Sequence, residues 1–152
     1  KYISDSFSHA GITNNHCLHW INISENNNIK LQDTIQLTAL KMKHKIPCWG
    51  YTLQDIEKKF TFITDTLPNS NAIKLAENSD VLIHEATYPH KYRKKATEHF
   101  HTTEIQAMEI ADTANVKRLI LTHFSQRLSD KEVMKWTWKG QSCVVFDKSQ
   151  NI

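Results

Sequence analysis

The stretch LILTHFSQR, residues 119–127, joins a short apolar run to a histidine and an arginine. Leu119 to Leu121 has the composition of a strand that is buried on both faces, as strands of parallel sheets are. A strand of this kind usually ends at a turn residue, whereas this one runs into His123. Such a histidine is either a hydrogen-bonded structural residue or a ligand that points into a site. Only the other segments of the chain distinguish the two.

Three further predicted strands also lead to residues that bind metals or carry protons. They are residues 34–42 before His44, residues 59–63 before Asp65, and residues 81–83 before His84 and Glu85. In layered α/β proteins, loops beyond the strand ends carry the functional groups. Imidazole and carboxylate groups without a nearby thiolate suit zinc or manganese in hydrolases. Taken singly, each residue is more often a cap or a turn, so the spacing alone leaves a structural role open.

The remaining pattern predicts further strands that alternate with helices. Strands are expected at residues 18–23, 51–53 and 143–146, and helices at 1–11, at 71–76 after Ser70 or Asn71, after Thr102 or Thr103, and at 130–135. The basic segment 88–95 is predicted to be a loop. Alternation of strand and helix is typical of the α/β class, so we expect one layered α/β domain.

Composition narrows the class of protein. The chain has 152 residues, the length of one domain, and a net charge of +3, which permits a polyanionic partner without requiring one. Three widely spaced cysteines exclude a disulfide framework, and a reducing compartment is expected. No apolar run is long enough to span a membrane, and the first residues do not resemble a signal peptide. We therefore expect an intracellular protein without a membrane segment.

Five segments between residues 34 and 127 resemble, in unbroken order, the successive motifs of ribonuclease Z, the tRNA 3′-processing endonucleases of the metallo-β-lactamase superfamily. The segments are MKHKIPCWGY (42–51), FITDTLPNS (62–70), SDVLIHEATY (79–88), HTTEIQAMEIA (101–111) and LILTHFSQR (119–127). The HEAT and HFSQR strings are specific, because generic hydrolases of the superfamily lack both. The resemblance implies an αββα sandwich with a two-zinc site along one edge and precursor tRNA as substrate.

The resemblance also implies a role for each motif residue. His44 resembles a ligand of the first zinc ion, Asp65 the carboxylate that bridges both, and His123 a ligand of the second. His101 resembles the proton donor to the leaving oxygen, and Glu85 orients it. The residues expected to hold phosphate or terminal nucleotides are Thr102, Thr103 and Arg127.

One family motif is absent from the sequence. HxHxDH, which supplies most ligands of both metals, occurs nowhere in the 152 residues. The short segment 45–64 also has no room for the tRNA-binding arm of short-form enzymes, as in the C-terminal part of the long form. We therefore expect the whole chain, residues 1–152, to be the C-terminal half of such a domain. An upstream half or a partner chain with HxHxDH would complete it.

Several alternatives stay open at the level of sequence. Thr64 stands where glycine is usual before the bridging aspartate, and Asp147-Lys148 where Asp-Gly is expected, as in a protein that has lost activity. The rival hypothesis is thus a catalytically inactive structural subunit of a ribonucleoprotein or other assembly, and a homodimer or larger assembly is also open. The cations at Lys91, Arg93, Lys94 and Lys95 form either a solvated surface or a contact with tRNA phosphates.

Overall fold

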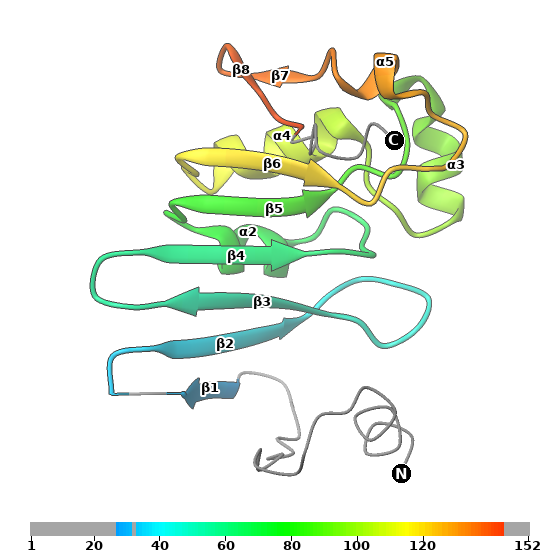
Figure 1. The fold of residues 1–152 in the computed structure, drawn as a ribbon. Coiled ribbons are helices and arrows are strands. Elements are labelled where there is room, and N and C mark those ends of the chain that lie inside the picture. The colour runs from blue at the N-terminus through cyan, green and yellow to red at the C-terminus, as the bar shows by residue number, and fades with distance from the viewer. Residues whose placement is uncertain (1–26, 32, 145–152) are drawn as a thin grey trace, which may run out of the picture.

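The computed structural model describes residues 27–31 and 33–144, and this part is built around one six-stranded sheet (Figure 1). The strands follow one another across the sheet in chain order: β1 (Asn27–Lys30), β2 (Gln36–Lys41), β3 (Trp49–Gln54), β4 (Lys59–Ile63), β5 (Val81–Glu85) and β6 (Arg118–Thr122). The pairs β1–β2, β2–β3 and β3–β4 are antiparallel, whereas the pairs β4–β5 and β5–β6 are parallel. The three parallel strands therefore end at one edge of the sheet.

The helices α2 (Ser70–Ala76) and α4 (Glu104–Thr113) pack on the same face of the sheet, behind the strands in Figure 1. The shorter helical elements are η1 (His90–Tyr92), α3 (Arg93–Glu98) and α5 (Asp130–Val133), and the small hairpin pairs β7 (Thr137–Trp138) with β8 (Gln141–Ser142). No helix among the described residues is long and apolar enough to cross a membrane.

Side-chain caps explain where the two main helices begin. The Asn69 side chain accepts a hydrogen bond from the Ala72 amide, so α2 begins one residue earlier than predicted. At α4, the Thr103 hydroxyl accepts from the Gln106 amide and the Gln106 side chain accepts from the Thr103 amide. This capping box confirms Thr103 as the cap of α4.

The α/β class is confirmed, and so are the predicted strands and helices that carry the motifs. Two predictions were wrong. The basic segment forms η1 and the start of α3, because lysine and arginine favour helix and Ala96 is buried beneath them. Cys143 and Val144 are not a strand: the Cys143 amide donates to Trp136 while its carbonyl accepts from Leu121, so no ladder forms. The predictions for residues 1–11, 18–23 and 145–148 lie outside the described residues.

Alternation along the strands separates a covered face from an open one. In β4, Thr61 and Ile63 are buried beneath the helices, whereas Phe60 and Phe62 are 50% and 45% exposed. The buried set forms the core, and its larger members are Leu40, Met42, Ile63, Leu75, Leu82, Ile110, Leu119 and Leu121. β4 therefore carries apolar side chains toward both faces, and helices cover only one of them.

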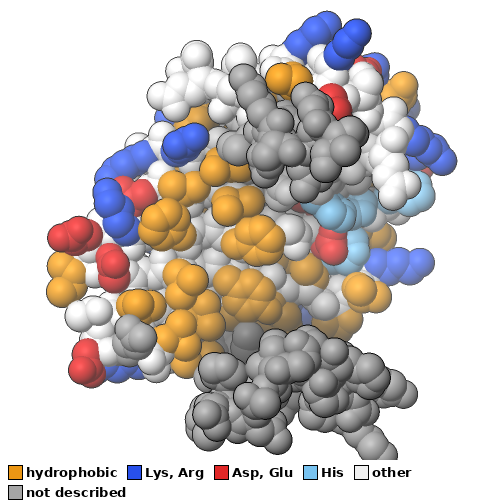
Figure 2. Space-filling model, viewed as in Figure 1, with side chains coloured by type: hydrophobic (Ala, Val, Ile, Leu, Met, Phe, Trp, Pro, Cys, Tyr) orange, Lys and Arg blue, Asp and Glu red, His pale blue; other side chains and the backbone are white. Residues whose placement is uncertain are grey.

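The open face carries two rows of apolar side chains across neighbouring strands. The pairing registers align Leu37, Leu53, Phe60 and Val81 in one row, and Tyr51, Phe62, Ile83 and Ile120 in the other. Figure 2 shows these strands covered by hydrophobic side chains, with histidines gathered at the adjoining edge. We call these eight residues the apolar face. No described element covers it, and a contiguous exposed apolar surface of this kind usually marks an interaction site.

Gly50 offers a direct test of packing between β3 and α2. A β-carbon there would lie 2.9 Å from Leu75 Cδ2, 3.0 Å from Met42 Cε and 3.1 Å from Ile63 Cγ1. Since all three belong to the closely packed core, we expect Gly50→Ala to lower the free energy of unfolding by about 1–3 kcal/mol. Urea unfolding followed by circular dichroism measures the loss.

A double variant separates crowding from other causes. Leu75→Val removes a methylene group at the closest contact, so it should cost less stability in the G50A background than in the wild type. Equal costs in the two backgrounds, or an unchanged unfolding midpoint for Gly50→Ala, would contradict the packing explanation.

Candidate functional site

The candidate site lies where the three parallel strands end. Asp65 follows β4, Glu85 is the last residue of β5, and His123 follows β6. Two loops add imidazoles: His101 comes from the segment before α4, and His44 from the connection between β2 and β3. Parallel register brings the strand ends to one edge, which confirms that residues far apart in the sequence converge there.

Glu85 is the buried acceptor at the centre of this edge. Its side chain is fully buried and accepts hydrogen bonds from His101 Nδ1 at 3.0 Å, the Thr66 amide at 2.6 Å, the Thr102 amide at 3.2 Å and the Thr87 hydroxyl at 2.5 Å. Burial alone would raise the pKa of Glu85, but these donors together hold it below its ordinary value. The carboxylate is therefore ionised at neutral pH.

Three imidazoles are each fixed through Nδ1. His44 donates to the Phe100 carbonyl at 2.9 Å, and His101 donates to Glu85. The Thr87 hydroxyl gives its single proton to Glu85, so at 2.9 Å it accepts from His123 Nδ1. In the neutral form, each ring then has its Nε2 lone pair free. A histidine held at one nitrogen by an acceptor is the usual arrangement of a metal-binding imidazole.

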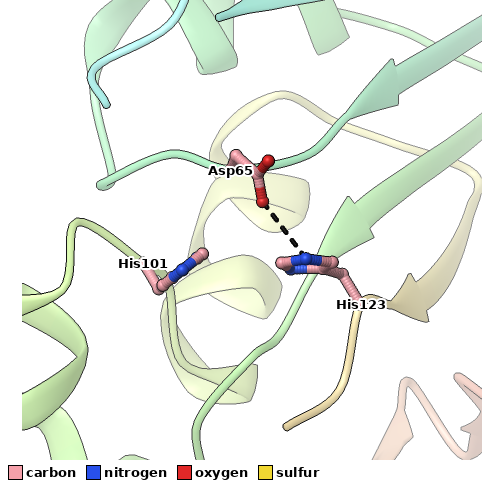
Figure 3. A group of neighbouring side chains, drawn as sticks. All are labelled: Asp65, His101 and His123. Carbon is pink, nitrogen blue, oxygen red and sulfur yellow. Dashed lines mark ion pairs between the residues drawn. The ribbon is translucent and has the colours of Figure 1, made fainter. Parts of the chain in front are cut away.

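When neutral His123 carries its proton on Nδ1, its Nε2 faces the Asp65 carboxylate with no proton between them. His123 Nε2 lies 3.3 Å from Asp65 Oδ1. Figure 3 shows the two side chains pointing toward each other. Asp65 Oδ1 is buried without a hydrogen-bond partner among the described residues. Two lone pairs at this distance repel unless a proton or a metal ion lies between or beside them. The donor set therefore fits a bound cation.

Backbone strain accompanies this arrangement. Asp65, Phe100 and His123 have φ angles of +46°, +61° and +57°, in the left-handed region that few residues other than glycine adopt. Phe100 directly precedes His101 and supplies the carbonyl that holds His44. Residues in such conformations cluster at functional sites, because the surrounding structure must offset their cost.

The structure brings two of the three predicted metal ligands, Asp65 and His123, close together and leaves His44 outside that group. Ligand atoms of Asp65, His101 and His123 all lie within 4.8 Å of one another. His44 is not in that group, although its ring centroid is 5.3 Å from that of His101. The structure thus places the predicted proton donor among residues that could hold a metal ion, while the assignments of Asp65, His123 and His44 as ligands stay predictions.

His101 and His84 have opposite environments. The hydrogen bond that His101 donates to Glu85 raises the pKa of His101 despite its partial burial, which favours a protonated ring near neutral pH. His84 is fully buried, and its burial lowers its pKa. Its Nδ1 donates to the backbone carbonyl of Glu85 and not to a side chain of the candidate site.

The predicted substrate-binding residues have different surroundings. Thr102 and Thr103 are fully buried; the Thr102 hydroxyl donates to the Thr66 carbonyl at 2.5 Å, and the Thr103 hydroxyl caps α4. These contacts favour a positioning role, and substrate binding by either threonine stays a prediction. Arg127 is exposed and has no acidic partner among the described residues.

Thr87 was not predicted from the sequence. Its hydroxyl joins Glu85 to His123 and lies 3.3 Å from His101 Nδ1, so it links the orienting carboxylate to both histidines. Its position two residues after Glu85 in the HEAT string is the signal that was available. The spacing of residues in the sequence does not reveal that the Thr87 hydroxyl donates its hydrogen to Glu85. That hydrogen bond determines the tautomer of His123, because the hydroxyl oxygen can then only accept from Nδ1.

Known proteins have sequences similar to that of this chain. The family model of the beta-lactamase superfamily domain matches residues 2–124. A ribonuclease BN of Proteus mirabilis is 48% identical over 86 residues, which are 57% of this chain and 28% of that enzyme. A ribonuclease Z of Limosilactobacillus reuteri is 24% identical over 194 aligned residues, with 95% of this chain and 63% of that enzyme covered.

A solved structure of a ribonuclease is also similar to this chain. Human tRNase Z, short form, superposes with a TM-score of 0.63 and 32% identity, over 68% of this chain and 40% of the human chain. The chain thus spans less than two thirds of the length of each of these three relatives. The comparisons confirm the metallo-β-lactamase fold that the motifs implied. The chain therefore belongs to the beta-lactamase superfamily and is a ribonuclease Z-like member of it.

Proposed function

We propose that this chain supplies part of the active site of a zinc-dependent endoribonuclease that cleaves precursor tRNA after the discriminator base and leaves a 3′-hydroxyl. The observation that carries the proposal is the pair of facing acceptors, Asp65 Oδ1 and His123 Nε2, 3.3 Å apart at the strand ends. The similar ribonucleases and tRNase Z support the substrate class. An enzyme with this substrate acts inside the cell.

The residues divide between holding metal and moving a proton. Asp65, His123 and His44 would hold the metal, with Asp65 as the carboxylate shared by two zinc ions. When bound, the metal pair would polarise the phosphodiester and lower the pKa of the attacking water. His101 would donate a proton from Nε2 to the departing 3′-oxygen, and Glu85 keeps that ring oriented and protonated.

A second segment would complete both the site and the sheet packing. Three protein ligands are too few for two zinc ions, and HxHxDH does not occur in the 152 residues. The apolar face has the composition of an inner sheet surface, and sheets pack face to face with such surfaces between them. A segment with HxHxDH, upstream in the same polypeptide or in a partner chain, would cover it. A homodimer would cover the face without supplying the motif.

A catalytically inactive structural subunit remains the second candidate. The absence of HxHxDH favours it, because without those ligands metal binding is weak. The contact between Asp65 and His123 favours the nuclease, since Asp65 Oδ1 is buried without a hydrogen-bond partner among the described residues and a bound metal ion would satisfy it. Zinc and manganese analysis of the purified assembly separates the two, and an assembly without metal excludes the nuclease.

His101→Ala tests the proton-transfer step. In the assembled enzyme we expect precursor tRNA cleavage to slow by about 10²-fold or more while zinc content is retained, as for the loss of a general acid. Single-turnover cleavage and elemental analysis of the same sample give the two quantities. Because His101 also lies in the cation-binding group, parallel loss of zinc would instead assign it as a ligand.

Thr87→Val tests whether the hydroxyl positions His123. Valine keeps the shape but neither accepts from His123 Nδ1 nor donates to Glu85, so we expect zinc affinity to fall by about 10–100-fold. Competition with a chelator in the assembled enzyme measures this affinity. The matched control is Thr87→Ser, which keeps the hydroxyl and should bind zinc as the wild type does; equal affinity of all three proteins would rule out the role.

The apolar face is tested by Phe62→Ser. Phe62 lies in the middle of a cross-strand row, so a polar residue there should weaken association with the HxHxDH-bearing segment of a ribonuclease Z by at least tenfold. Analytical ultracentrifugation of the mixed segments measures association. Ile56→Ser is the control, because Ile56 is 87% exposed in the β3–β4 turn, outside both rows. If both substitutions weakened association equally, the HxHxDH-bearing segment would not bind at the apolar face.

A further inference from the structure

Phe100, the residue before His101, has a backbone conformation that its side chain disfavours. Its φ angle of +61° lies in the left-handed region, where the β-carbon of an L-residue comes too close to the following carbonyl oxygen. Glycine, asparagine and aspartate adopt this region most readily, and a bulky residue there is an outlier. The surrounding structure must therefore hold Phe100 in this conformation.

The C-terminal end of α3 imposes the conformation of Phe100. The His101 amide donates to the Ala96 carbonyl at 2.8 Å, and the Phe100 amide donates to the Thr97 carbonyl at 3.2 Å. This pair of hydrogen bonds is the Schellman motif, in which the chain leaves a helix through one left-handed residue that is usually glycine. Phe100 occupies that position, so the motif fixes the backbone of His101 relative to α3.

α4 ends in the same motif with a different residue. The Val116 amide donates to the Ala111 carbonyl at 3.0 Å, and the Asn115 amide donates to the Asp112 carbonyl at 3.1 Å. Asn115 is the left-handed residue there, with a φ angle of +53°, and asparagine tolerates this conformation. An aromatic residue is thus not required to end a helix in this way. The helix end therefore does not explain the ring of Phe100.

Both the backbone and the ring of Phe100 contact His44. The Phe100 carbonyl accepts from His44 Nδ1 at 2.9 Å, and the two rings lie edge to face, with centroids 6.3 Å apart and an interplanar angle of 83°. Aromatic rings attract each other in this arrangement. His44 comes 56 residues earlier, in the connection between β2 and β3. One strained residue therefore joins that connection to the end of α3.

We infer that Phe100 is a positioning residue for His44, with its carbonyl selecting the tautomer of the imidazole and its ring fixing the orientation. Glycine at this position would relieve the backbone, but it would remove the ring and leave the carbonyl free to turn away. Strain of this kind persists where it maintains the geometry of a functional site. The inference rests on the proposed function for the role of His44 as a metal ligand, whereas the contacts themselves need no metal.

Thermal unfolding followed by circular dichroism tests whether Phe100 is strained. Phe100→Gly and Phe100→Ala both remove the ring, and only alanine keeps the β-carbon. We expect Phe100→Gly to unfold about 2–4 °C above Phe100→Ala, because relief of the left-handed residue outweighs the greater freedom of glycine in the unfolded chain. Equal midpoints would contradict the strain.

The tautomer of His44 tests the positioning role directly. Two-dimensional ¹H–¹⁵N NMR of the imidazole, in the chain with EDTA and at a pH where the ring is neutral, shows which nitrogen carries the proton. We expect the proton on Nδ1 in the wild type and in Phe100→Tyr, which keeps the ring. Phe100→Gly should give a mixture of both tautomers. The matched control is Asn115→Gly, which changes the same helix-end position of α4 and should keep the wild-type tautomer.

Zinc affinity of the assembled enzyme is the second measurement. We expect Phe100→Gly to lower this affinity by about 10–100-fold, as is usual for residues that orient a metal-binding histidine. Phe100→Tyr and Asn115→Gly should bind zinc as the wild type does. Competition with a chelator gives the four affinities.

The wild-type tautomer or the wild-type zinc affinity in Phe100→Gly would overturn the inference, and so would equal changes in Asn115→Gly. The proposed nuclease fails separately from the inference. An assembly without metal would overturn the nuclease, while the tautomer of His44 in the metal-free chain would still decide whether Phe100 positions it. Conversely, an unchanged tautomer in Phe100→Gly would leave metal binding and cleavage by the wild type untouched.

Discussion

The buried carboxylate of Glu85 is the interaction on which the candidate site depends. It accepts hydrogen bonds from Thr66 on the loop after β4, from Thr87 on the loop after β5, and from His101 and Thr102 before α4. Three loops are therefore tied to one side chain at the end of β5, the strand between β4 and β6. Loss of the carboxylate would leave several buried donors unpaired, each at a cost of about 1–3 kcal/mol. The geometry of the histidines follows from this constraint, since Glu85 determines which nitrogen of His101 and, through Thr87, which nitrogen of His123 carries the proton.

Parallel strands explain why these groups meet at all. A parallel register places the ends of β4, β5 and β6 at one edge, and the crossover helices α2 and α4 lie on one face because each links parallel neighbours. Asp65 and His123 have left-handed backbone conformations, so the chain changes direction directly after β4 and β6. The fold thus concentrates strain and unpaired acceptors at one edge, where a bound cation would offset both.

The sequence predicted the parts of the fold that depend on local pattern. β5 and β6 are short apolar runs with polar ends, and α4 has a threonine cap and a glutamine three residues later, so their positions follow from composition. β1 was not predicted, because its asparagines have low strand propensity and pairing with β2 stabilises it. The same limit applies to the site. Strand ends indicated Asp65, Glu85 and His123, but the links through Thr87 depend on contacts between segments far apart in the sequence.

The apolar face and the candidate site meet at the same edge of the sheet. The row that contains Phe62, Ile83 and Ile120 crosses the three parallel strands shortly before their ends, and Asp65, Glu85 and His123 lie just beyond it. A second sheet packed on this face would bring its own loops to that edge, so burial of the apolar rows and completion of the ligand set would be one event. Metal affinity and association would then be coupled, because each stabilises the arrangement that the other requires.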